Sequence, residues 1–264
     1  MGRAGAVLLT IDVGNTNTVL GVFEGDALRV HWRLTTRREQ TADEYGIIVR
    51  NLFGTSDLAP ARVEAVALAS VVPPLTPVLV ELSRQYLGHD PLVVGPEVET
   101  GMPILYEPPG DVGADRIVNG VAALAAYGGP VIVVDFGTAT TFDVITRRGE
   151  YAGGVICPGI GISADALFQR AARLPRVDVR HPGPVVGRST VGSMQSGLYF
   201  GYAAMCEGLI ARIRGELGEP ARVVATGGLA ETLASDIPSI EAVDPVLTLT
   251  GLRLIWERNR PGER

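Results

Sequence analysis

The sequence predicts an α/β fold of two related halves, each with a mixed sheet flanked by helices. The main observation is a repeat. An apolar strand that ends in Asp-x-Gly and runs into a second apolar strand occurs twice, as LLTIDVGNTNTVLGVF and as VIVVDFGTATTFDVI. In each half the repeat opens a run of strands, after which helices and strands alternate. The copies are 123 residues apart (135 − 12) when Asp12 is aligned with Asp135, and this offset also pairs Gly14 with Gly137 and Thr18 with Thr141.

In the first half, periodicity and turn residues give the order of the elements. A helix is expected at Thr41–Leu52, where Thr41-x-x-Glu44 fits a capping box. A second helix is expected at Leu75–Leu87, and the segment Gly95–Gly113, rich in Pro and Gly, predicts an extended loop. Strands are expected at Val7–Val13, Thr18–Glu24, Leu28–Leu34, Ala65–Ser70 and Leu92–Val94.

The second half repeats this plan after a connecting helix. That helix is expected at Ala114–Tyr127, because apolar residues recur at helical spacing and Gly-Gly-Pro follows. A long helix is expected at Ser196–Leu217 and a final one at Leu249–Arg258. These elements predict domains at 1–116 and 117–264. Strands are expected at Val131–Asp135, Thr141–Ile145, Tyr151–Ile156 and Ala221–Ala225.

Composition excludes several classes of protein. The chain has 264 residues, 46% of them hydrophobic, and a net charge of −6 without any Lys/Arg run, which argues against nucleic acid as a partner. Cys157 and Cys206 lack metal-ligand spacing and suit a reduced compartment. The first apolar stretch ends at Ile11 before the acidic Asp12, so we expect neither a signal peptide nor a membrane span, and a cytoplasmic location.

The first Asp-x-Gly turn has the composition of a phosphate-binding turn. Gly and small polar residues between two strands let backbone N–H groups approach phosphate oxygens closely. The Asp12 carboxylate at the strand end can hold a hydrated Mg²⁺ against those phosphates. An ordinary β-hairpin uses the same residue types. Partial repetition of the turn at Asp135 favours the nucleotide site over the plain hairpin.

A third glycine-containing turn, Thr226-Gly227-Gly228, follows a strand in the second half. Such a turn can let a flat ring or a phosphate lie against the backbone. Two Asp-x-Gly turns with a later Gly-Gly turn resemble the actin-like ATPase and sugar kinase superfamily. That resemblance implies two ribonuclease H-like domains with a nucleotide cleft between them, and it leaves the second substrate open.

A carboxylate lies beside the Pro/Gly loop at the junction of the halves, in Gly113-Ala114-Asp115-Arg116. Asp115 in the first turn of a helix has a structural explanation, since the helix dipole favours an acidic residue there. The same carboxylate can accept a proton from a substrate hydroxyl. Arg116 offers a fork of donors for a carboxylate or a phosphate.

At these residues the chain resembles one family closely, the type III pantothenate kinases. The motifs DVGNTN, YEPP with GADR, DFGTATT and SMQSG occur here in the family's order. The resemblance runs from Val7 to about Glu257, and no motif position departs from the pattern. It implies ATP-dependent phosphorylation of pantothenate, the first step of coenzyme A synthesis, by in-line phosphoryl transfer.

The resemblance also implies roles for individual residues. Asp115 matches the general base, and Asp135 matches the ligand of a monovalent cation, K⁺ or NH₄⁺. Family members are homodimers in which the partner subunit helps to form the pantothenate site. The ATP-binding positions are Asp12, Val13, Gly14, Asn15, Thr16, Asn17, Thr18, Val19 and Thr138. The pantothenate-binding positions are Tyr106, Gly113, Ala114, Asp115, Arg116 and Thr190.

The sequence leaves two alternatives to this function open. One is another small-molecule kinase of the same superfamily, and the other is a nucleotide-binding regulator without turnover. The segment Met194–Gly197 at the start of the long helix can serve as a helix cap or can shape the site. His31, His89 and His181 have no second ligand at metal spacing, so we expect them to be structural or solvated.

Overall fold

The computed structural model describes residues 7–260, which divide into two compact units. The first unit comprises the described residues up to Ala122 and those from Thr248 onward, and the second comprises Ala123–Leu247. The sequence placed every residue after 116 in a second domain. The structure differs from this expectation, because the closing helix returns to the first unit, where Leu249 packs closely on Gly21.

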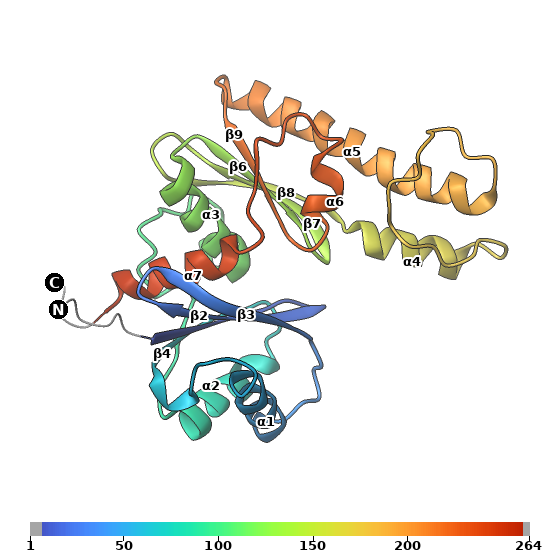
Figure 1. The fold of residues 1–264 in the computed structure, drawn as a ribbon. Coiled ribbons are helices and arrows are strands. Elements are labelled where there is room, and N and C mark those ends of the chain that lie inside the picture. The colour runs from blue at the N-terminus through green and yellow to red at the C-terminus, as the bar shows by residue number, and fades with distance from the viewer. Residues whose placement is uncertain (1–6, 261–264) are drawn as a thin grey trace. The chain divides into compact units, whose positions relative to one another are not determined.

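The first unit is built on a mixed sheet with strand order β3-β2-β1-β4-β5. The central strand β1 pairs antiparallel with β2 and parallel with β4. One face of the sheet is covered by two helices, which share a buried core with β1, β2 and β4 (Figure 1). The strands are β1 (Val7–Val13), β2 (Asn17–Glu24), β3 (Ala27–Thr35), β4 (Val63–Ser70) and β5 (Leu92–Val93), and the helices are α1 (Ala42–Phe53) and α2 (Leu75–Leu82).

The helices of this unit begin and end close to the expected residues. The predicted capping box opens α1, with the Glu44 carboxylate accepting from Thr41 N–H at 2.8 Å. The chain after α2 continues as one π-helical turn, η2 (Ser83–Leu87). The remaining elements are η1 (Pro60–Arg62), η3 (Pro109–Asp111), α3 (Ala114–Tyr127) and the closing helix α7 (Leu247–Arg258).

The second unit repeats the topology of the first. Its sheet has the order β10-β9-β6-β7-β8, with β6 antiparallel to β7 and parallel to β9. This matches the first sheet strand for strand and confirms the predicted fold class of two related α/β halves. The strands are β6 (Val131–Phe136), β7 (Ala139–Ile145), β8 (Tyr151–Pro158), β9 (Arg222–Thr226) and β10 (Ala242–Val243), and the helices are α4 (Ile160–Arg170), α5 (Thr190–Leu217) and α6 (Ala230–Ala234).

The two Asp-x-Gly hairpins differ in length, which corrects the sequence alignment of the repeat. In the first hairpin Val13 is paired with Thr18, whereas in the second Phe136 is paired with Thr140. The first turn is therefore one residue longer, and the structural counterpart of Thr18 is Thr140 rather than Thr141. A constant offset could not reveal this, because the inserted residue lies inside the turn.

The long helix α5 begins six residues earlier than expected (196 − 190), at Thr190. Ser189 is its N-cap, and its side-chain oxygen accepts from Gly192 N–H at 3.1 Å. The first turn of the helix contains Val191 and Gly192, which have low helix propensity. The Ser189 cap offsets that low propensity. The short elements α4, α6 and β10 were not predicted from the sequence.

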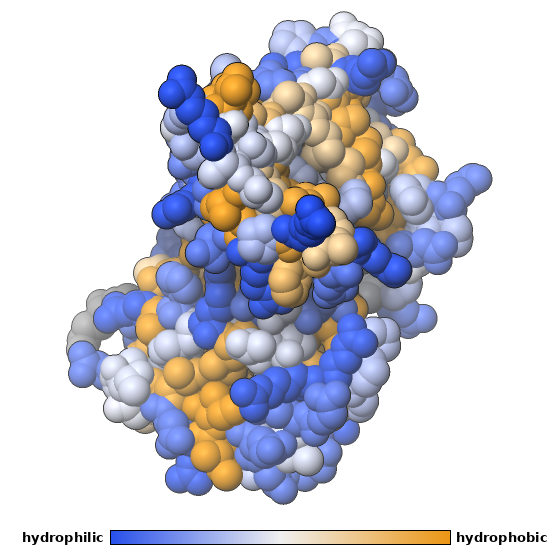
Figure 2. Space-filling model, turned by 90° about the vertical axis from the view of Figure 1, so that its right-hand side faces the viewer, coloured by the Kyte–Doolittle hydropathy of each residue, from blue (hydrophilic) through white to orange (hydrophobic). Residues whose placement is uncertain are grey.

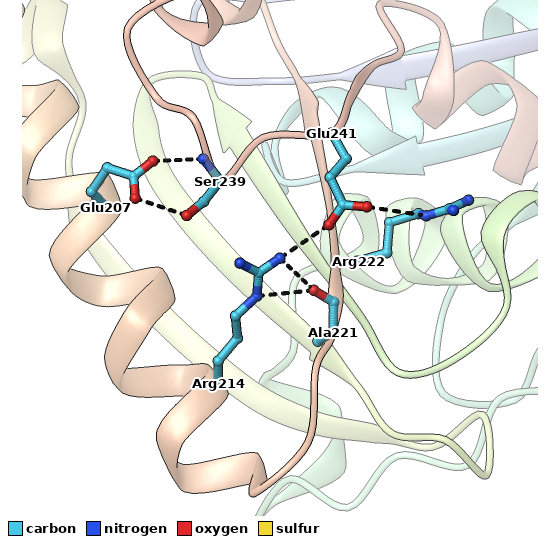
Figure 3. Close-up of polar contacts among 6 residues, drawn as sticks. All are labelled: Glu207, Arg214, Ala221, Arg222, Ser239 and Glu241. Carbon is cyan, nitrogen blue, oxygen red and sulfur yellow. Dashed lines mark hydrogen bonds and ion pairs between the residues drawn. The ribbon is translucent and has the colours of Figure 1, made fainter.

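The C-terminal half of α5 is tied to the strand β9 region by polar contacts (Figure 3). The Arg214 guanidinium donates to Ala221 O at 3.0 and 2.7 Å, and it pairs with Glu241 at 3.0 Å. Glu241 also pairs with Arg222 at 3.5 Å. Two turns earlier on the helix, Glu207 accepts from the Ser239 N–H and hydroxyl, both at 2.7 Å. These contacts fix the helix against its sheet.

Candidate active site

The first phosphate-binding candidate is the turn between β1 and β2 in the first unit. Asp12 is the penultimate residue of β1 and is half-buried. The turn closes with Gly14 N–H donating to Asn17 O at 2.9 Å. Asn15 and Thr16 at its tip are exposed. The exposed tip presents small polar residues at the end of the central strand, where an anion can approach.

The corresponding turn of the second unit joins β6 to β7. Gly137 N–H donates to Ala139 O at 3.1 Å, and Thr138 O accepts from Gly159 N–H at 3.1 Å. Asp135 is the penultimate residue of β6 and is paired with Thr226 of β9. The site residues Asp135 and Thr138 therefore lie three residues apart at one strand end.

Gly227 brings the end of β9 against the Asp135 carboxylate. It has a φ of 92°, and a Cβ at this position would collide with Asp135 Oδ1 and lie 2.7 Å from the backbone of Phe136. Only glycine has room there and adopts this backbone conformation without strain. The result is a compact corner in which the Asp135 carboxylate lies against the end of β9.

Asp115 lies in the first turn of α3, as the sequence predicted. Its Oδ1 accepts from the N–H of Arg116 at 2.8 Å. Burial raises the pKa of the Asp115 carboxyl above its ordinary 3.8, while this hydrogen bond and the neighbouring Arg116 charge oppose the rise. A carboxylate with a raised pKa is a stronger base, which suits the abstraction of a proton from a hydroxyl.

Contacts within the first unit bring Asp115 and the phosphate turn toward the same edge of the sheet. Val71, directly after β4, donates its N–H to Val13 O at the end of β1 at 3.0 Å. The Val71 side chain in turn lies 3.5 Å from the Cβ position of Gly113. The start of α3 therefore adjoins the carboxyl end of β4, next to the strand that carries Asp12.

The closing helix α7 holds α3 in this position. Thr248 donates its hydroxyl to Asn119 Oδ1 at 2.7 Å. Gly251 approaches Val118 O so closely that a Cβ would collide with it. Sequence reasoning did not assign α7 any part in the site, since these contacts join residues more than 120 positions apart.

The remaining substrate-binding candidates lie in two places. Tyr106 is half-buried in the loop before η3 of the first unit. Thr190 is the exposed first residue of α5 in the second unit. It lines a groove of about 780 Å³ together with Leu167, Leu174, Gly187, Arg188, Ser189, Ser193, Met194, Gly197 and Leu198.

The SMQSG motif lies inside α5, so its interpretation as the helix cap is wrong. Two of its side chains donate to the preceding loop: Gln195 Nε2 to Asp178 O at 3.1 Å and Ser196 Oγ to Val185 O. The motif therefore holds residues 178–185 on the helix next to the groove. This favours the second interpretation, in which the motif shapes the site.

Apolar side chains are exposed around the groove. Figure 2 looks at the side toward which α4 and the first turns of α5 extend in Figure 1, and it shows apolar side chains gathered there among charged ones. The exposed apolar residues of α4, of the loop before α5 and of the first turn of α5 are Ile162, Leu167, Phe168, Val185, Val186 and Val191. A surface of this kind is a candidate for protein–protein contact.

Residues 7–260 contain neither a cluster of metal-ligating side chains nor a membrane-spanning helix. No three His, Cys, Asp or Glu side chains in this range are grouped so that they could hold a metal ion among themselves. No helix within the same range is long and apolar enough to span a membrane. His89 contacts Val63 O at 2.8 Å, and His181 contacts the rings of Tyr199 and Phe200, in keeping with structural roles.

The fold is shared with solved structures at low sequence identity. An inorganic polyphosphate/ATP-glucomannokinase from Arthrobacter matches with a TM-score of 0.52 and 16% identity, over 96% of this chain and all of that one. A Campylobacter jejuni protein assigned to the Baf family of transcriptional activators matches with a TM-score of 0.61 and 20% identity, over 95% of this chain and 98% of that one. At these identities the likeness shows the fold alone.

Comparison of the amino-acid sequence with known proteins identifies the family. Type III pantothenate kinases of Moorella thermoacetica and Anaeromyxobacter dehalogenans are 56% and 57% identical to this chain, over 96% of its length and the whole of theirs. The family model described as type III pantothenate kinase matches residues 8–212, a range that includes both Asp-x-Gly turns and Asp115. The chain belongs to the type III pantothenate kinase family.

Proposed function

We propose that the protein phosphorylates pantothenate with ATP and that Asp115 is its general base. Family membership makes the chain a pantothenate kinase, which transfers a phosphoryl group to the pantothenate hydroxyl in coenzyme A synthesis. The assignment of Asp115 rests on its raised pKa and on its position at the start of α3. A carboxylate with a raised pKa opens α3 beside the strand edge that carries the phosphate turn.

The chemistry at Asp115 follows from phosphoryl transfer. The pantothenate hydroxyl attacks the γ-phosphorus, the bond to the β-γ bridging oxygen breaks, and ADP leaves. The hydroxyl proton passes to Asp115. Because the transition state of such transfers is loose, the protein contributes mainly alignment and charge neutralisation. Arg116, whose side chain is buried beside Asp115, is assigned with Gly113, Ala114 and Tyr106 to pantothenate binding.

The triphosphate is assigned to the first turn, from Asp12 to Val19. Mg²⁺ keeps several water ligands and is commonly bound by one carboxylate together with substrate phosphates. Asp12, half-buried at the strand end, fits that requirement without a cluster of acidic residues. When bound, the ion neutralises phosphate charge, while the turn itself holds and orients the phosphate oxygens.

The second turn is assigned to the monovalent cation. Asp135 and the adjacent backbone of Gly227 form the compact corner described above, and Thr138 next to it is assigned to ATP. A K⁺ or NH₄⁺ ion there adds positive charge that a chain with a net charge of −6 otherwise lacks. The Asp135 carboxylate would supply oxygen ligands and a negative charge for this ion.

The exposed apolar residues of α4 and the start of α5 are assigned to a homodimer interface, with Thr190 as a pantothenate contact beside it. Burial of these side chains in a second copy would remove apolar surface from water. Sedimentation velocity should then report twice the monomer mass of 27.8 kDa. A monomer at micromolar concentration would contradict this assignment. We place the enzyme in the cytoplasm, because its two cysteines are free, which suits a reduced compartment.

The reaction is tested by identifying its product. Incubation with MgATP and pantothenate should yield phosphopantothenate by mass spectrometry. A panel of sugars and small hydroxy acids at equal concentration should yield no phosphorylated product. Faster phosphorylation of one of these acceptors than of pantothenate would instead favour another small-molecule kinase.

A further inference from the structure

The segment that follows β3 lies directly on the phosphate turn. It consists of Thr36, Arg37 and Arg38, and no motif assigns it a role. Its first and last members make four contacts to the turn, across more than 15 residues of sequence.

Thr36 binds the turn through both its backbone and its side chain. Its N–H donates to Thr16 O at 2.9 Å, and its hydroxyl donates to Gly14 O at 2.7 Å. The same hydroxyl lies 2.9 Å from the hydroxyl of Thr18. Because a hydroxyl has one proton, and Thr36 gives its proton to Gly14, Thr18 is the donor in this second contact. Thr36 therefore fixes three of the turn residues at once.

Arg38 binds the exposed tip of the turn. Its Nη2 donates to Asn15 Oδ1 at 3.1 Å. With the amide oxygen occupied, Asn15 presents its NH₂ group, a donor, to any anion at the turn. The Arg38 side chain is exposed, and its guanidinium has further N–H donors in a planar fork that matches phosphate oxygens. The contact thus brings a permanent positive charge to the turn of an acidic protein.

We propose that Thr36 and Arg38 complete the triphosphate-binding site, Thr36 as a positioning residue for the turn and Arg38 as a direct phosphate ligand. This inference rests on the assignment of the turn to ATP. It predicts that loss of either residue weakens the binding of MgATP and leaves the binding of pantothenate unchanged, because both residues act on the turn. It also predicts that Arg38 acts on the phosphates of the nucleotide and not on its adenosine.

Two substitutions test the proposal against matched neighbours. Thr36→Val keeps the shape of the side chain and removes the hydroxyl, with Thr35→Val as its control. Arg38→Met removes the charge and the fork, with Arg37→Met as its control. Thr35 and Arg37 are exposed, and their side chains make none of the contacts to the turn described above. Thermal melting of each variant checks that the fold is retained.

We expect Thr36→Val to raise KM for MgATP about 5- to 30-fold and Arg38→Met about 10- to 100-fold, as for lost neutral and charge-assisted hydrogen bonds. KM for pantothenate and the control variants should stay within about twofold of the wild type. Arg38→Lys should recover part of the ATP affinity, because it keeps the charge but not the fork. Adenosine affinity should be the same in Arg38→Met as in the wild type.

Equal increases in KM for both substrates, or an unchanged KM for MgATP in Thr36→Val and Arg38→Met, would overturn the proposal. Asn15→Ala in the same assay distinguishes failure of the proposed roles of Thr36 and Arg38 from failure of the assignment of the turn to ATP. If Asn15→Ala raises KM for MgATP and the two variants do not, only the role of Thr36 and Arg38 fails. If Asn15→Ala has no effect either, the assignment of the turn to ATP fails, and the proposal fails with it.

Discussion

Replacing Asp115 with Asn should lower activity and raise stability at the same time. In the wild type, Asp115 accepts a hydrogen bond from Arg116 N–H at 2.8 Å. Asn has the shape of the neutral acid and can still accept this bond, so the local structure should be retained. It cannot take a proton from a hydroxyl. Loss of a general base costs ~10²–10⁴-fold in kcat, which is about 2.7–5.4 kcal/mol of transition-state stabilisation at 1.36 kcal/mol per tenfold.

The expected gain in stability follows from the raised pKa. A carboxyl whose pKa is higher in the folded than in the unfolded state favours folding while it is protonated, and this contribution is lost as the pH rises through the folded-state pKa. At neutral pH the buried Asp115 carboxylate therefore destabilises the fold relative to a neutral isostere. The melting temperature of Asp115→Asn should exceed that of the wild type at pH 7, and the difference should shrink as the pH falls toward 3.8.

Steady-state kinetics and thermal melts on the same preparations test both parts, with Asp111→Asn as the control. Asp111 is an exposed carboxylate of η3, four residues before Asp115, and its substitution should change neither quantity appreciably. Wild-type kcat in Asp115→Asn would refute the assignment of the general base. A lower melting temperature together with lower kcat would point to a structural role instead.

Two further predictions concern the second unit. Asp135→Ala should abolish most of the activation by K⁺. Gly227→Ala should weaken it as well, since its methyl group would collide with the Asp135 carboxylate and its φ of 92° costs ~1–2 kcal/mol in a non-glycine residue; unchanged K⁺ titrations in both variants would contradict the cation assignment. Burial raises the pKa of the Cys206 thiol to about 12, so at pH 8 iodoacetamide should modify the half-buried Cys157 and leave Cys206 unmodified in the native protein. Peptide mapping that finds Cys206 modified as fast as Cys157 would count against this.

Much of the fold was predictable because its signals are local. The capping box at Thr41 and Glu44 marked the start of α1, and Gly-Gly-Pro marked the end of α3 at Tyr127. The repeat of Asp-x-Gly indicated two sheets of the same topology, which β1 and β6 confirm at the centres of their sheets. Apolar runs of strand length between turn residues favour buried strands, and their order was therefore predictable.

The parts that sequence reasoning missed depend on contacts between distant residues. The single-residue difference between the hairpins changes which threonine is paired with Phe136, and no local pattern records it. The early start of α5 depends on the Ser189 cap, which precedes a stretch of weak helix formers. The contact of Arg38 with Asn15 joins two exposed polar residues 23 positions apart, a pairing that neither periodicity nor composition indicates.

The proposed site couples ATP consumption to pantothenate phosphorylation and depends on a monovalent cation. Its most direct test is an ADP-release assay in four arms, with and without pantothenate and each with and without K⁺. Rapid ADP release is expected only when both pantothenate and K⁺ are present, with a much lower rate when either is omitted. Equal ADP release with and without pantothenate would contradict it.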